Sequence, residues 1–241
     1  MNRAELYKIR RHRTPWVLGG LLATSLVTPP VVMYFLNTTE PSTYMEALTN
    51  IYGLALAMTA AVFGGWLVGH EYRQGTLRRM ASIDARRGRL IATKAFVGTA
   101  FFLGAAALIG VVGAAATELA ANLGGVDLLW DGVARSMAGS MATAMVYGAF
   151  SLALSLVFRN DSYAMLTTIG VLVVFSPLLS LIPTVGDYLP GTAIDQLDTW
   201  VRNVEAFGQA TISNSTALVV LTAWLGGVIA LGMQLFARRD I

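Results

Sequence analysis

The residue types that most often carry out chemistry are scarce in this chain and occur in incomplete patterns. His70 and Glu71 open like the zinc-protease motif H-E-x-x-H, but the position of the second histidine holds Gln74, so one zinc ligand is missing. His12 and His70 are the two histidines, and no cysteine is present to act as a nucleophile, a disulfide partner or a metal ligand. We therefore expect no catalytic residue and no metal site in this chain.

The lysines do not form a nucleotide-binding site either. A P-loop needs the sequence Gly-Lys-Ser/Thr, in which backbone amides and the ammonium group together hold the phosphates. The two lysines, Lys8 and Lys94, follow Tyr7 and Thr93 instead. The chain therefore cannot hydrolyse ATP through a P-loop, and we expect it to hold no cofactor of its own.

The composition indicates that these residues are carried by helices in a lipid bilayer. Of the 241 residues, 55% are hydrophobic and 13% are charged, and the mean hydropathy is +0.61. Soluble domains have roughly 25% charged residues, so a water-soluble chain of this composition would lack the polar surface to cover its exterior. We predict an all-α polytopic membrane protein.

Six apolar stretches are long enough to cross roughly 30 Å of hydrocarbon, since a helix rises about 1.5 Å per residue. They cover residues 16–36, 51–69, 95–116, 136–158, 163–183 and 217–237. None of them contains Asp, Glu, Lys, Arg or His. Because ion-coupled carriers and proton pumps usually place an ionisable group at membrane depth, we expect any coupling energy to enter from outside the bilayer.

The charges between the stretches predict the orientation. Of the 17 basic residues, 15 lie in the N-terminal arm, the loop 70–94, the short link after residue 158 and the C-terminal tail. The opposite loops contain most of the acidic residues, and Arg135 and Arg202 are their basic residues. Lys and Arg accumulate on the cytoplasmic face, so we expect both termini there and one transmembrane domain over residues 1–241.

The most informative segment is the basic loop 70–94, with the sequence HEYRQGTLRRMASIDARRGRLIATK. Gly75 offers a break after the second span, and Thr76 is a residue type that caps a helix beyond it. A short rigid helix there would offer a surface for a soluble partner to push. The alternative is a loop that only anchors the chain to anionic lipid, at roughly 1 kcal/mol per basic residue.

The order of residues around this loop resembles the permease subunits of ABC-2 type exporters. The matching features are Glu71 at the end of the second span, G-T-L-R at 75–78, R-G-R-L at 87–90 and Lys94 at the third span. The basic arm and the ending F-A-R-R-D at 236–240 are also similar to that family. The resemblance implies a type V exporter-like transmembrane domain of six helices, with an elbow helix along the inner surface at residues 1–15.

The resemblance also implies partners. Permeases of this family pair with a separate soluble P-loop ATPase, commonly two copies, which binds ATP and Mg²⁺. A second permease chain, identical or a sister chain, completes the complex, together with membrane lipid and without nucleic acid. The residues that would couple to the ATPase are Glu71, Arg73, Gly75, Thr76, Leu77, Arg78 and Arg79.

Two helix faces are candidates for a cargo path. An aromatic face of the second span contains Tyr52, Thr59, Phe63 and Trp66, which helical spacing places together. It could line a central cavity, or it could pack against lipid and neighbouring helices. A hydroxyl face of the fourth span contains Ser140, Thr143, Tyr147 and Ser151. It could line a polar path, or it could form hydrogen bonds between helices.

The external loop 184–215 is predicted to contain a short helix at 195–207, close to the outer membrane surface. The favoured function is a permease subunit of an ATP-driven exporter in a bacterial plasma membrane, which moves a drug, peptide antibiotic or lipid by alternating access. The rivals are an ATP-independent channel or carrier, a membrane-embedded enzyme, and a non-transporting sensor or immunity protein of the same fold.

Overall fold

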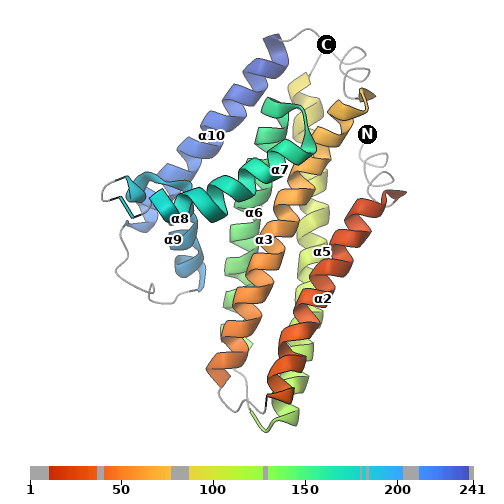
Figure 1. The fold of residues 1–241 in the computed structure, drawn as a ribbon, viewed down its shortest axis with the longest axis vertical. Helices are drawn as coiled ribbons and strands as arrows, with labels where there is room; N and C mark the ends of the chain where they lie inside the picture. The colour runs from red at the N-terminus through yellow and green to blue at the C-terminus, as the bar shows by residue number, and fades with distance from the viewer. Residues whose placement is uncertain are drawn as a thin grey trace.

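The computed structural model describes residues 11–36, 41–76, 87–126, 130–179, 181–182, 185–202 and 212–238. These residues form helices joined by turns, with no β-strand among them (Figure 1). The helices are α2 (Arg13–Phe35), α3 (Pro41–Arg73), α5 (Arg87–Leu123), α6 (Trp130–Phe158), α7 (Asp161–Ile169), α8 (Ser176–Leu179), α9 (Pro190–Arg202) and α10 (Asn214–Arg238). A π-helical turn, Gly170–Phe175, joins α7 to α8, and a 3-10 turn, Gly186–Tyr188, precedes α9. The predicted all-α class is confirmed.

Among the residues that the structure describes, four helical segments are long and apolar enough to cross a membrane. They are Asn50–Arg73, Ile91–Leu123, Gly132–Phe158 and Asn214–Leu235. Each contains or closely matches one predicted span, so a multi-pass membrane protein is confirmed. The predicted spans 16–36 and 163–183 correspond to α2 and to the succession of α7, the π-helical turn and α8. The count of six spans stays a prediction.

The closest helix packing joins α3 to α6, because small residues face each other there. A Cβ atom on Gly64 would overlap the carbonyl oxygen of Gly148. A Cβ on Gly65 would lie 2.9 Å from the Ser151 hydroxyl oxygen. Glycine at position 64 lets the two backbones approach, and glycine at position 65 leaves room for the Ser151 side chain. Small residues of this kind are the usual basis of tight helix association in a bilayer.

The helices divide into two groups that share α6. On one side, α2 packs on α3 and α5 around the buried residues Leu22, Tyr52 and Leu56. On the other side, α9 and α10 pack on α6 around Phe150 and Ile194. In Figure 1, α7 crosses this second group obliquely. The start of α2, the end of α3, the start of α5 and the end of α10 lie toward the same end, called here the basic end.

The short helix in the external loop begins earlier than predicted. It was expected at 195–207, and α9 covers Pro190–Arg202. Proline at the first position of a helix is favoured because it has no amide hydrogen to satisfy and its φ angle suits the helix. The next amide, that of Gly191, donates to the Ser176 hydroxyl at 3.0 Å. Residues 203–207 of the prediction lie outside the described residues.

Candidate functional site

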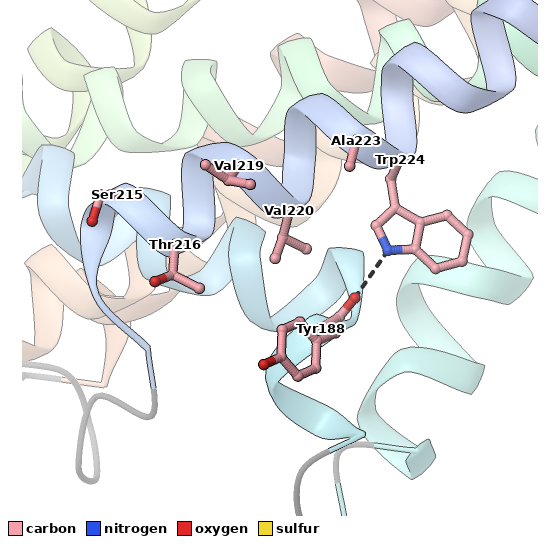
Figure 2. Close-up of a pocket in the computed structure, with 7 residues that line it drawn as sticks. All are labelled: Tyr188, Ser215, Thr216, Val219, Val220, Ala223 and Trp224. Atoms are coloured by element: carbon pink, nitrogen blue, oxygen red, sulfur yellow. Dashed lines mark hydrogen bonds between the residues drawn. The ribbon is translucent and has the colours of Figure 1, made fainter.

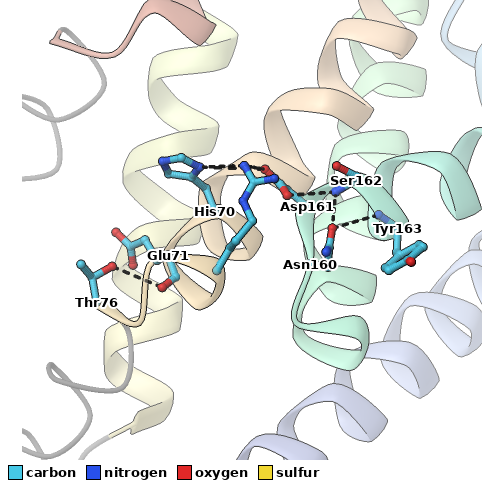
Figure 3. A network of polar contacts seen from close by, with 8 residues as sticks. His70, Glu71, Thr76, Asn160, Asp161, Ser162 and Tyr163 are labelled. Carbon is cyan, nitrogen blue, oxygen red and sulfur yellow. Dashed lines mark hydrogen bonds and ion pairs between the residues drawn. The ribbon is translucent and has the colours of Figure 1, made fainter.

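The last turn of α3 at the basic end, His70 to Arg73, concentrates polar contacts between helices (Figure 3). Glu71 pairs with Lys94, which lies two turns into α5, with 2.9 Å between the ammonium nitrogen and the carboxylate. The Lys94 side chain is 0% exposed and the Glu71 side chain is 5% exposed. A buried ion that loses its partner is strongly destabilising, so this pair depends on both members. The Glu71 carboxylate therefore points between helices, toward Lys94.

Two residues further on, Arg73 pairs with Asp161, the first residue of α7. The guanidinium nitrogen lies 3.0 Å from the Asp161 carboxylate, and the Arg73 side chain remains 53% exposed. Asn160 caps α7, since its side-chain oxygen accepts hydrogen bonds from the amides of Ser162 and Tyr163 at 2.8 and 3.3 Å. An acidic side chain in the first turn also suits the helix dipole.

The link between α6 and α7 makes a sharp reversal at Arg159, whose φ of 56° lies in the left-handed region. The Arg159 guanidinium carbon lies 5.8 Å from the centre of the Tyr72 ring, within cation–π range. The short link between α6 and α7 is thus held against the end of α3.

Three aromatic rings, those of His12, Trp66 and His70, connect the end of α3 to the start of α2. The ring centres of His12 and His70 are 5.3 Å apart, and those of His12 and Trp66 are 5.5 Å apart. Trp66 and His70 stack at 5.9 Å. The residue before α2 is therefore packed on the last two turns of α3.

α3 ends at Arg73, and Gly75 follows it as the break that the sequence predicts. Its φ of 69° is the left-handed conformation that commonly terminates helices. The Thr76 hydroxyl donates back to the Glu71 carbonyl at 3.3 Å, so it closes the end of α3. The other predicted coupling residues, Leu77, Arg78 and Arg79, lie outside the described residues, as does the arm 1–10.

The predicted aromatic face of α3 is packed within the chain. The Tyr52 hydroxyl donates to the Ala106 carbonyl at 3.1 Å and is buried. Phe63 and Trp66 are also buried, and their ring centres lie 5.8 Å apart. Thr59 and Phe63 border a space of about 30 Å³ beside α2. These contacts are what the packing alternative predicts.

Phe63 also borders a larger apolar groove between α3, α5 and α6. Its volume is about 210 Å³, and Leu67, Gly98, Phe102 and Leu152 contribute to its walls. Of the four residues on the aromatic face, Phe63 is the one that reaches this groove.

The predicted hydroxyl face of α6 is covered by two helices. The Ser140 hydroxyl lies close to α3, because a Cβ on Gly53 would come within 3.2 Å of it. The adjacent Gly139 lies against α9, since a Cβ there would come within 2.6 Å of the Asp198 carboxylate and 2.8 Å of Arg202. The other end of the face is buried against α3 at Ser151. Thr143 and Tyr147 lie between these ends and are partly buried. Helix packing accounts for this face as well.

The α9 residues over that face are charged. Asp198 pairs with Arg202 at 2.8 Å. Burial raises the pKa of Asp195 to about 6, and the neighbouring Asp198 adds to the rise. Burial also raises the pKa of Asp198, and Arg202 opposes that rise.

A second concave region lies beside the first half of α10 (Figure 2). Its lining is mostly apolar, its volume is about 420 Å³, and the Trp224 indole donates to the Tyr188 carbonyl at 2.9 Å. None of the predicted site residues that the structure describes lines it. Within the described part of the chain, no group of three or more His, Cys, Asp or Glu side chains is placed to hold a metal ion.

Sequence reasoning did not assign roles to Asp161 and Arg159, and it treated Lys94 only as part of a resemblance. The signal for Lys94 was available, because a lysine at the edge of an apolar span requires a partner when it is buried. No local signal marks Asp161 as the partner of Arg73, since 88 residues separate them.

The whole chain matches a known family. A family model described as ABC-2 family transporter protein matches residues 2–241. No curated protein matches the chain. The apolar helices and the family match together indicate a membrane transport subunit. The chain therefore belongs to the ABC-2 family of membrane permeases of ABC transporters.

Proposed function

We propose that this chain is the permease subunit of an ATP-driven exporter, which moves an amphipathic or hydrophobic cargo across the bacterial plasma membrane by alternating access. The observation that carries the proposal is the last turn of α3, where ion pairs to α5 and α7 meet at the start of the basic loop. A loop that only anchors the chain to lipid would not need ion pairs that join its first residues to two other helices.

The coupling residues then divide into two roles. Arg73 is exposed and Gly75 and Thr76 are partly exposed, so they can face a soluble partner together with Leu77, Arg78 and Arg79. Glu71 is buried and acts through Lys94. The partner is a soluble P-loop ATPase in two copies, which supplies ATP and Mg²⁺, and a second permease chain completes the complex.

The apolar groove beside Phe63 supports a hydrophobic cargo. Its walls come from α3, α5 and α6, with Ile229 of α10 at its border. Apolar contact there would stabilise an acyl chain or a hydrophobic ring system through the hydrophobic effect. The rest of the cargo path would form between two permease chains.

The test is purification of the tagged chain from its native membrane in mild detergent. We expect a soluble P-loop ATPase to remain bound and to show vanadate-sensitive hydrolysis. The double variant Arg78→Glu/Arg79→Glu should lose the ATPase and still insert in the membrane. The matched control is Arg135→Glu, near the start of α6 and away from the basic end. This variant should retain the ATPase. An oligomer of this chain alone, from a preparation where known complexes survive, would favour a channel or a sequestering protein instead.

A further inference from the structure

Four consecutive residues at the end of α3 contact four other segments of the chain, and His70 also lies 4.0 Å from the Asp161 carboxylate that Arg73 binds. Each helical residue is rotated by about 100° from the one before, so four residues cover most of the helix circumference. His70 contacts His12 before α2, Glu71 pairs with Lys94 of α5, Tyr72 lies under Arg159 after α6, and Arg73 pairs with Asp161 of α7. We call this set the α3 junction.

The ion pair to α5 is the most enclosed contact of the junction. Glu71 and Lys94 lie at the two ends of the basic loop, 23 residues apart in sequence, and their side chains are almost fully buried. In a low-dielectric interior, separating the two charges is costly. The start of α5 must therefore follow the end of α3 when the loop is displaced.

The ion pair to α7 is positioned by different groups. Asn160 and Asp161 fix the first turn of α7, and Asp161 reaches Arg73 at 3.0 Å. A Cβ on Gly69, one turn before Arg73, would lie 2.5 Å from the Asp161 amide nitrogen, so the α3 backbone itself lies against the start of α7. Movement of the α3 end is thus passed to α7 through both a charge pair and direct contact.

We propose that Lys94 and Asp161 are positioning residues for coupling. Lys94 ties α5, and Asp161 ties α7, to the end of α3, so that a push on the basic loop moves three helices together. This inference rests on the proposed function, because it needs an ATPase that acts on the loop. It predicts that breaking one ion pair stops the movement of one helix and leaves the movement of the other, since each ion pair serves a different helix.

The test uses spin-label distances in the complex with its copurified ATPase. The chain has no cysteine, so cysteines at two exposed sites label it specifically. One pair joins Phe96 of α5 to Leu231 of α10, and the other joins Leu166 of α7 to Leu231. Labelled chain is diluted with unlabelled chain, and distances are compared with and without ATP and vanadate.

In the otherwise unmodified chain we expect both distances to shift by about 2 Å or more. Glu71→Gln should abolish the α5 shift and keep the α7 shift, and Asp161→Asn should do the reverse. The exchange Glu71→Lys/Lys94→Glu should restore at least half of the α5 shift. Asp198→Asn, which breaks an ion pair on α9, is the matched control and should leave both shifts intact.

The outcomes separate the two proposals. Absence of a copurifying ATPase overturns the proposed function, and the junction with it. A bound, active ATPase with both shifts unchanged in Glu71→Gln and Asp161→Asn overturns the junction alone. Equal loss of both shifts in each variant, without restoration by the charge exchange, also overturns it, because that pattern indicates general destabilisation.

Discussion

Glu71 and Lys94 illustrate how burial changes the role of a charged residue. From the sequence, Glu71 is a candidate for contact with an ATPase, and Lys94 is a basic residue at the start of a span. The structure places the two side chains together, with the Lys94 side chain 0% exposed. A charge in that position contributes by holding two helices in register, and its removal leaves its partner without compensation.

We expect Lys94→Ala to lower the free energy of unfolding by about 3–5 kcal/mol, because Glu71 would remain as a buried, unpaired charge. The measurement is thermal unfolding of the purified chain in detergent. Arg89→Ala, an exposed residue of the same helix, is the control and should change little. Adding Glu71→Gln to Lys94→Ala should recover part of the loss, and a double variant less stable than Lys94→Ala would contradict the explanation.

At the level of helices, small residues decide how closely α3 and α6 approach. Gly64 lies directly against the Gly148 backbone, and Ala60 lies nearby on the same face. The absence of side chains permits many weak contacts along the two backbones. This pair of helices supports both the α3 junction and the apolar groove.

We expect Gly64→Ala to destabilise the chain by about 1–3 kcal/mol, because the added methyl group overlaps the carbonyl of Gly148. Gly104→Ala is the matched control, since a Cβ there meets nothing within 4 Å. Thermal unfolding of both variants checks the difference. Equal stability of the two variants would show that α3 and α6 can move apart without a loss of stability.

We expect docking of α9 on α6 to weaken as the pH rises. The pKa of Asp195 is raised to about 6 by burial and by Asp198, so the docked state binds its proton more tightly than the undocked state does. The stabilisation is complete below the ordinary pKa near 4 and is lost as the pH rises through about 6. Asp195 is nevertheless an exposed residue by surface area, so solvent screens its charge and the effect should be small.

Spin labels at Trp200 of α9 and Met145 of α6, both exposed, would report this docking. The distance distribution should broaden between pH 5 and pH 8. The same labels in an Asp195→Asn background should give a narrow distribution at both values. Equal broadening in that background would assign the pH effect to another group.

At the scale of the whole molecule, the family match and the apolar helices agree that the chain crosses the membrane several times. The basic end gathers the start of α2, the end of α3 and the start of α5. Basic residues are retained on the cytoplasmic side during insertion. We therefore propose that the basic end is cytoplasmic.

Single cysteines test that orientation. Tyr188→Cys, exposed in the 3-10 turn before α9, should react with a membrane-impermeant maleimide added to intact cells. Arg89→Cys, exposed at the start of α5, should react only after the membrane is opened. The reverse pattern would place the basic end outside and would remove the basis for a cytoplasmic ATPase contact.

The sequence by itself determined the membrane class, the positions of most helices and the family. These properties depend on local composition, because the free energy of transfer to lipid adds up residue by residue along each span. The break after α3 at Gly75 was predictable for the same reason, since the preference for a left-handed conformation is a property of one residue.

Only the tertiary structure decided which helix faces meet. Glu71 and Lys94 are 23 residues apart, and Arg73 and Asp161 are 88 residues apart. The aromatic face around Tyr52 and the hydroxyl face around Ser140 each allowed two interpretations. Periodicity shows that residues share a face, but the neighbour of that face depends on the combined packing of all the helices.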